Sequence, residues 1–345
     1  PRPPQSTLLP YTTPYRSITT PLAMHGTIVK EDGSAVKVCI GEDEKDPVFF
    51  ITDLLPHLSK DMMGKKIGEA VEGEMLNLLI GSIPWEDKDE KERFKYNVLA
   101  ILHEKYGIVE EDFTSAELEI VPAGRARDAG LDRSMIGAYG QDDRVCAYTS
   151  LKAIFDAEEN KKSIFAIFAD KEEIGSVGDT SMSSKFFENF VYEILSLSGC
   201  KNPDMSIRRS LQNSKFLSAD VNAAVDPNFA NTHDKFNAVY LGEGVAITKY
   251  TGVRGKSSSN DAHAEFMAEI RKLFNKSDIL WQVGELGKVD MGGGGTIAFI
   301  PAALGMDVID CGIGLLSMHS PWEISSKGDV YMLYKAFKSF YESDM

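Results

Sequence analysis

The stretch SIFAIFADKEEIGSVG, residues 163–178, contains the pattern that decides the fold. Its first seven residues, 163–169, form a continuous apolar run, which is typical of a strand buried on both faces of a sheet. Similar runs at 216–219, 245–249, 279–283 and 308–311 alternate with amphipathic, helix-like patterns at 261–274, 296–304 and 329–341. This alternation predicts an α/β fold with a mainly parallel sheet and helices on both faces.

The residues before this region have a different, strand-rich pattern. GTIVKEDGSAVKVCI, residues 26–40, predicts two strands joined by a turn at Asp32 and Gly33. Short apolar runs at 47–51 and 118–122 predict further strands, and the charged stretch 85–95 predicts the opening of a solvated helix. We therefore expect a smaller β-rich domain that precedes a larger α/β domain.

Three segments follow from these patterns. We place a boundary near 123–134, which gives a β-rich domain at 21–125 and an α/β domain at 126–345. Residues 1–20 precede both, and six of the 14 prolines lie within the first 21 residues. This opening is interpreted either as an extended arm or as a start within a longer protein.

Composition excludes several classes of function. The 345 residues carry a net charge of −15, which disfavours nucleic-acid binding and attraction to an anionic membrane. No apolar run approaches the roughly 18 residues that a membrane span needs. The four cysteines are scattered without a CxxC pair, so we expect a cytoplasmic protein that lacks a disulfide framework.

Polar clusters near the ends of the predicted strands carry the candidate chemistry. They lie at 141–144, 170–173, 218–220 and 318–320, and they supply several carboxylates and the imidazole of His319. These are ligands that zinc, cobalt or manganese accept, and a two-metal hydrolase needs such a set with a separate base. Two alternatives stay open: the paired acids could be solvated surface, and His319 could be a hydrogen-bonded structural residue.

A run of four glycines, 292–295, precedes one predicted helix. Its backbone N–H groups could hold an anion or a carboxylate, or the run could simply form a tight turn. It matches neither GxxxxGK[ST] nor GxGxxG, so it does not indicate nucleotide binding.

Several motifs, taken in order along the chain, resemble those of the M18 family of metalloaminopeptidases, the aspartyl-aminopeptidase type, and most of all its bacterial, clostridial branch. They are PLAMHG (21–26), FITDLLPHL (50–58), GQDDRVCAYTS (140–150), ADKEEIGSVG (169–178), SADVNAAVDPNF (218–229), GELGKVDMGGGGT (284–296) and LSMHSPWE (316–323). The resemblance implies a zinc-exopeptidase-like fold and removal of N-terminal residues from peptides. It does not carry over a preference for acidic N-terminal residues, because Ala223 and Asp226 stand where other branches have histidines.

The resemblance also implies roles for individual residues. They are Asp142 as the ligand that bridges two metal ions, Glu172 as the general base, Glu173 as the adjacent ligand, and Asp220 and His319 as terminal ligands of different ions. The two divalent ions are expected to be zinc, with cobalt or manganese as alternatives. Water activated between them would attack the first peptide carbonyl after Glu172 takes its proton.

Substrate binding and assembly are implied in the same way. His57 matches a histidine that the smaller domain, as a dimerisation and lid domain, contributes to a neighbouring subunit's site. Gly293, Gly294 and Gly295 would shape the substrate pocket. Family members assemble from dimers into a tetrahedral dodecamer, so peptides and further copies of the chain are the expected partners.

One family feature is absent from the sequence. The first metal ligand of the family is a histidine in an HxD motif, and these 345 residues contain no HxD. The catalytic domain at 126–345 is therefore expected to be incomplete on its N-terminal side. The alternative function is a catalytically impaired or non-catalytic subunit that acts in assembly, and a metal-dependent phosphatase is a third possibility.

Overall fold

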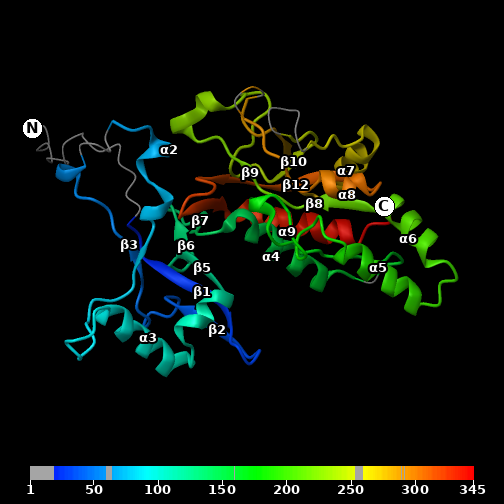
Figure 1. Ribbon diagram of the computed structural model, residues 1–345. Helices are drawn as coiled ribbons and strands as arrows, with labels where there is room; N and C mark the ends of the chain where they lie inside the picture. The colour runs from blue at the N-terminus through cyan, green and yellow to red at the C-terminus, as the bar shows by residue number, and fades with distance from the viewer. Residues whose placement is uncertain (1–18, 60–63, 159, 253–258, 289, 291) are drawn as a thin grey trace, which may run out of the picture. The chain divides into compact units, whose positions relative to one another are not determined.

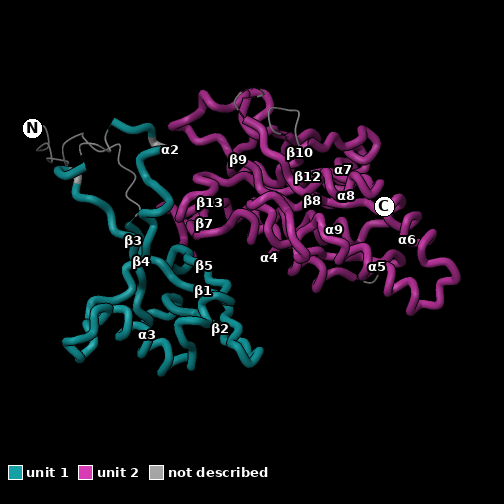
Figure 2. The backbone as a smooth tube through the Cα atoms, viewed as in Figure 1, with its two compact units in different colours: residues 1–125 teal, residues 126–345 magenta. Residues whose placement is uncertain are grey.

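Figure 1 shows the protein as a computed structural model. The structure describes residues 19–59, 64–158, 160–252, 259–288, 290 and 292–345. The chain forms two compact units, residues 1–125 and 126–345, which are coloured separately in Figure 2. Each unit is described by itself.

The first unit is built on a three-stranded antiparallel sheet in the order β2-β1-β5. Its strands are β1 (Leu22–Val29), β2 (Ala35–Ile40) and β5 (Ala116–Pro122). The turn between β1 and β2 falls at Asp32 and Gly33, as predicted, and Gly33 has a positive φ of 81° that suits a residue without a side chain. The core of the unit is small and consists of Ile28, Val38, Ile40 and Ile108.

One long helix and several short elements complete this unit. The helix is α3 (Arg93–Tyr106); the short elements are β3 (Phe50–Ile51), β4 (Leu78–Leu79), α2 (Ile67–Ala70) and the 3-10 helices Pro56–Leu58, Gly73–Met75 and Glu110–Ser115. The prediction that the helix opens within 85–95 is confirmed, because it begins at Arg93, near the end of that stretch. Before it, the Asp87 side chain accepts the backbone N–H of Asp89, a local bond that competes with helix formation.

The second unit contains an eight-stranded sheet. Its strands are β6 (Arg127–Ala129), β7 (Met135–Ala138), β8 (Lys215–Ser218), β9 (Asn222–Ala223), β10 (Val245–Thr248), β11 (Trp281–Val283), β12 (Asp307–Leu316) and β13 (Glu323–Ser326). The main order is β11-β10-β12-β13-β7-β6, and β8 and β9 also pair with β12. β12 is therefore the strand on which the sheet is organised.

The sheet is mixed, so the prediction of a mainly parallel sheet is corrected while the α/β class is confirmed. Among the described residues, β8 and β9 each pair with β12 in parallel, and β10 pairs with β11 in parallel. The β10–β12, β12–β13, β13–β7 and β6–β7 pairs are antiparallel. The reason is local: a turn at 317–322 reverses the chain between β12 and β13, which makes them a hairpin.

The two faces of β12 serve different purposes. Ile309, Cys311 and Ile313 lie in the main apolar core, which contains residues of α4 (Gln141–Asp156), α7 (Ala264–Lys276) and α9 (Lys327–Tyr341). The residues between them point to the other face because side chains alternate along a strand. Val308 on that face packs with α6 (Pro203–Gln212), α8 (Phe299–Ala303) and Phe187 of α5 (Phe186–Leu197). Helices thus cover both faces, as predicted, and Figure 1 shows α4 and α9 side by side.

The prediction of a strand at 163–169 is wrong for the described residues. This segment has no regular secondary structure and is not part of a sheet, because no described segment forms a hydrogen-bonded ladder with it. Its residues 163–167 line a cavity of about 530 Å³ together with Phe216 and Leu217. The apolar run is thus partly covered without being paired.

No helix among the described residues has both the length and the apolar character needed to cross a membrane.

Candidate metal centre

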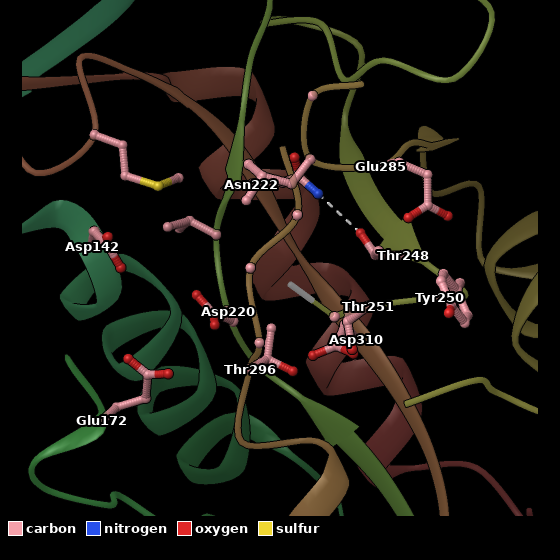
Figure 3. Close-up of a pocket in the computed structure, with 18 of the residues that line it drawn as sticks. Asp142, Glu172, Asp220, Asn222, Thr248, Tyr250, Thr251, Glu285, Thr296 and Asp310 are labelled. Carbon is pink, nitrogen blue, oxygen red and sulfur yellow. Dashed lines mark hydrogen bonds between the residues drawn. The ribbon is translucent and has the colours of Figure 1, made fainter. Parts of the chain in front are cut away.

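A cavity of about 620 Å³ lies in the second unit, on the face of β12 that carries Asp310 and Gly312. Its wall contains Asp142, Glu172, Glu173, Asp220 and His319, five residues that the sequence marks as candidates. They come from four separate segments of the chain. Figure 3 shows Asp142, Glu172 and Asp220 facing into the pocket from different ribbons.

Three candidate ligands meet at one side of this pocket. The Nε2 atom of His319 is 2.9 Å from Oδ2 of Asp142 and 3.4 Å from Oε1 of Glu173. Asp142 is in the first turn of α4, where its backbone is not helical; Glu173 is in the 3-10 helix Glu172–Ile174; and His319 follows β12. His319 has a left-handed φ of 62°, which turns the chain back towards the sheet.

A second group forms around the same aspartate. One carboxylate oxygen each from Asp142, Asp143 and Asp220 lies within 4.8 Å of the others. Asp220 is held in the break between β8 and β9, which pair with successive parts of β12. Gly312 of β12 lies directly against it, because a Cβ atom at this position would be 1.8 Å from the carbonyl oxygen of Asp220.

The electrostatics of the two groups favour cations. Burial, and next the charge of Glu173, raise the pKa of Asp142 to about 6. Burial also raises the pKa values of Asp143 and Asp220 well above the ordinary range, and Asp142 adds to both. Oδ1 of Asp143 is buried without a hydrogen-bond partner among the described residues. Converging, partly unsatisfied carboxylates with one imidazole fit the donor set of divalent metal ions.

Glu172 lies beside these groups but belongs to neither. Its carboxyl group is half-buried, and its pKa is raised first by burial and then by the charge of Glu173. A raised pKa brings a carboxylate closer to the range in which it exchanges protons near neutral pH. The adjacent Glu172 and Glu173 thus differ in position, with Glu173 in contact with His319.

Glu323 connects two of the candidate ligands through their backbones. Its Oε2 accepts the N–H of Asp142 at 3.0 Å, and its Oε1 accepts the N–H of His319 at 2.8 Å. The residue is 2% exposed, and Gln141 holds its strand by donating from Nε2 to the Glu323 carbonyl oxygen at 2.7 Å. One buried carboxylate therefore fixes the separation of two ligand-bearing segments.

The remaining predicted site residues have different surroundings. Gly293, Gly294 and Gly295 line the cavity, and Gly293 has a positive φ of 93°. The glycine run does not open a helix directly, since α8 begins at Phe299. His57 is exposed in the 3-10 helix Pro56–Leu58 of the first unit. The structure thus brings together the five metal-site candidates with the three glycines, and it describes His57 only within its own unit.

Four acidic residues of this pocket region were missed by the sequence analysis: Asp143, Glu285, Asp310 and Glu323. Asp143, Glu285 and Glu323 each lie inside one of the family-like motifs, so an acidic side chain within such a motif is the available signal. Asp310 interrupts the apolar run 308–311, and a charge inside a buried strand is a recognisable exception.

The fold and pocket together define an α/β protein with a carboxylate-rich candidate metal centre. The chain matches the family described as aminopeptidase I zinc metalloprotease (M18) over residues 12–341. It is 56% identical over 326 residues to the probable M18 family aminopeptidase 1 of Clostridium acetobutylicum, covering 94% of this chain and 70% of that protein. The corresponding Thermotoga maritima protein is 52% identical over 328 residues, covering 95% and 72%.

Solved structures agree with this assignment. A crystal structure of an M18 aminopeptidase from Thermotoga maritima has a TM-score of 0.90 at 52% identity, covering 94% of this chain and 71% of that one. Aminopeptidase I from Clostridium acetobutylicum has a TM-score of 0.88 at 54% identity, covering 95% and 71%. The chain belongs to the M18 family, which confirms the resemblance seen in its sequence motifs.

Proposed function

We propose that this chain is a metal-dependent aminopeptidase that removes N-terminal residues from peptides with the help of two divalent metal ions. The observation that carries the proposal is that Asp142 belongs to both ligand groups. A carboxylate has two oxygens, so a residue shared by two groups is placed to bridge two ions. Membership in the M18 family supports the same reaction.

The residues present would divide between two ions. Asp142, Glu173 and His319 would hold one ion, and Asp142 and Asp220 would hold the other, with Asp143 beside them. Zinc is the ion that the family description names, and cobalt or manganese suits the same donors. When bound, such ions acidify water and polarise a carbonyl group.

The protein's own groups perform the proton transfer and the positioning. Glu172 accepts the proton of the attacking water on its carboxylate and then donates it to the amine that leaves. Glu323 keeps the Asp142 and His319 backbones at a fixed separation, so their side chains converge without rearrangement. The three glycines allow the substrate backbone to approach the pocket wall closely.

Hydrolysis and metal binding test the proposal together. The chain is supplied with zinc, cobalt or manganese, its bound metal is measured, and aminoacyl anilides are offered with their N-acetylated forms as controls. We expect metal to bind and only substrates with a free N-terminus to be cleaved. Absence of both metal binding and cleavage, or cleavage of phosphate esters in place of peptides, would overturn it.

Roles in assembly and location are further proposals. We propose that the first unit acts as a dimerisation and lid domain and that His57 reaches a neighbouring copy's site. Dimers and a dodecamer, which the family resemblance implies, stay predictions that native mass spectrometry of the chain tests. A cytoplasmic location likewise stays a prediction, tested by fractionating cells.

A further inference from the structure

A buried carboxylate without a partner lies in the pocket outside both ligand groups. Asp310 is in β12 between Ile309 and Cys311, which face the helical core, so its side chain points to the pocket. It is 3% exposed, and neither carboxylate oxygen has a hydrogen-bond partner among the described residues. A buried carboxylate left alone is costly, which indicates that a ligand completes its environment.

The nearest polar neighbours of Asp310 do not supply that partner. The hydroxyl groups of Ser218 and Thr296 lower its pKa somewhat, but neither forms a hydrogen bond of good geometry with it. Burial outweighs them and raises the pKa of Asp310 to about 6. The protein groups around Asp310 are therefore a poor environment for its negative charge, and a cation would improve that environment.

Glu285 adds a second carboxylate to the same part of the pocket. It follows β11, and its backbone N–H donates to the Asn237 carbonyl oxygen at 2.7 Å. Burial raises the pKa of its half-buried carboxyl group to about 7, although Lys249 opposes the rise. Lys249 is itself paired with Asp261, so its positive charge is already balanced. Within the described part of the chain, Asp310 and Glu285 therefore keep a net negative charge.

Neither residue of this acidic pair belongs to the two ligand groups, although the charge of Asp310 acts on both Glu285 and Asp220. Figure 3 shows Glu285 across the pocket from Asp142 and Glu172, with Asp220 between them in the view. Leu286 and Phe299 also line the pocket and offer apolar surface. A long side chain with an apolar stem and a cationic end matches both features, because lysine buries its methylene groups while its ammonium group seeks a carboxylate.

We propose that Asp310 and Glu285 form the subsite for the side-chain ammonium group of an N-terminal lysine, so that the pocket selects peptides that begin with this residue. The proposal rests on the proposed aminopeptidase function. The substrate's first carbonyl lies at the candidate metal centre, and the lysine side chain extends from there along the apolar surface to Asp310.

Two small ligands, compared with each other, measure what the side-chain ammonium group contributes to binding. L-lysinamide and L-norleucinamide share the α-amine and a straight side chain, but only the former carries the side-chain charge. Their binding to the full chain is measured by isothermal titration calorimetry, with and without added zinc. We expect lysinamide to bind at least about tenfold more tightly, as is usual for a desolvated charge pair.

Variants locate the effect. Asp310→Asn should bring the two affinities to near equality, and Glu285→Gln should reduce their ratio by a smaller factor. Asp307→Asn is the matched control, because Asp307 is on the same strand but outside the pocket and pairs with Lys215. It should leave the ratio unchanged.

Each other result overturns the proposal. Equal affinity for the two ligands would show that no side-chain ammonium site exists. Equal weakening of both ligands by Asp310→Asn would place the α-amine there. Tighter binding of the α-amide of glutamate than of lysinamide would show that the subsite prefers a negatively charged side chain. Hydrolysis is scored separately with lysyl and norleucyl anilides, so a chain that cleaves neither refutes the aminopeptidase function while the affinity ratio still decides the subsite.

Discussion

The two ends of the pocket are built on different kinds of backbone. At the candidate metal centre the side chains come from turns and helix starts, where Lys171 and His319 have left-handed φ values of 64° and 62°. At the other end Asp310 belongs to a regular strand. Side chains that must converge on a small ion need irregular backbone to aim them, and strained positions of this type are common at functional sites. A single buried charge needs only a strand that faces the cavity.

The largest expected effect is at the first end. Glu172→Gln should lower turnover of an aminoacyl anilide by about 10²–10⁴-fold, because the amide cannot accept the proton of water. Metal content should stay unchanged, since Glu172 is outside both ligand groups. Glu188→Gln serves as the control, because Glu188 is a half-buried residue of α5 that pairs with Lys185 and lies outside the pocket. Loss of metal in the Glu172 variant would reassign it as a ligand.

The second prediction concerns the strand-borne charge. The folded-state pKa of Asp310, about 6, is above its ordinary value of 3.8, so protonation favours the folded protein. The stabilisation is present below pH 4 and is lost as the pH rises through 6. Because asparagine does not titrate, Asp310→Asn should gain about 3 kcal/mol in unfolding free energy relative to the unsubstituted, metal-free chain between pH 4 and 8.

Urea unfolding at several pH values measures this difference. Asp307→Asn removes a carboxyl group that is 44% exposed, so it controls for the loss of one negative charge. A flat difference for Asp310→Asn would mean that the carboxyl group has a partner in the folded protein.

The third prediction tests how the first end is held together. In Glu323→Gln the side-chain NH₂ group would face a backbone N–H, so Asp142 and His319 could not both be held. We expect metal affinity to fall by about 10–100-fold, as for other residues that orient ligands. The visible absorption of bound cobalt(II) reports ligand geometry directly. Glu342→Gln, which loses a pair with Lys338, should leave that spectrum unaltered.

The smallest effect is expected from metal removal. Chelation leaves Asp142 with a raised pKa of about 6, so the stability of the metal-free chain falls as the pH rises through that value. The melting temperature should therefore drop by more on chelation at pH 8 than at pH 5.5. Calorimetry with and without chelator measures the drop, and an equal drop at both pH values would show that the burial and crowding of the Asp142 charge do not control stability.

The same contrast explains what the sequence could reveal. The metal-site candidates were predictable because they belong to polar motifs that follow apolar runs, although the run before Glu172 and Glu173 is not a strand of the described sheet. The role of Glu323 could not be predicted, because it depends on β13 lying against the start of α4, a contact between residues 181 positions apart. Asp310 was not predicted as a site residue, because the apolar residues around it indicate only a buried strand.

Errors in the fold have a similar origin. The apolar run 163–169 meets every local criterion for a strand, yet a strand exists only when another segment pairs with it. Local composition does not name that partner. The antiparallel hairpin of β12 and β13 is not evident from the sequence, because its turn, 317–322, contains no Asn-Gly or Asp-Gly pair of the kind that marks a tight hairpin.

The alternation along β12 has a consequence for how sequences of this kind can change. Insertion or deletion of one residue near its start would exchange the positions of Ile309, Cys311 and Ile313 with those of Asp310 and Gly312. It would drive a carboxylate into the helical core and set a branched side chain against Asp220. Single substitutions in this strand keep the alternation of its side chains, whereas a change in its length does not. We therefore expect related active proteins to preserve the number of residues between Gly305 and His319 even where the residues themselves differ.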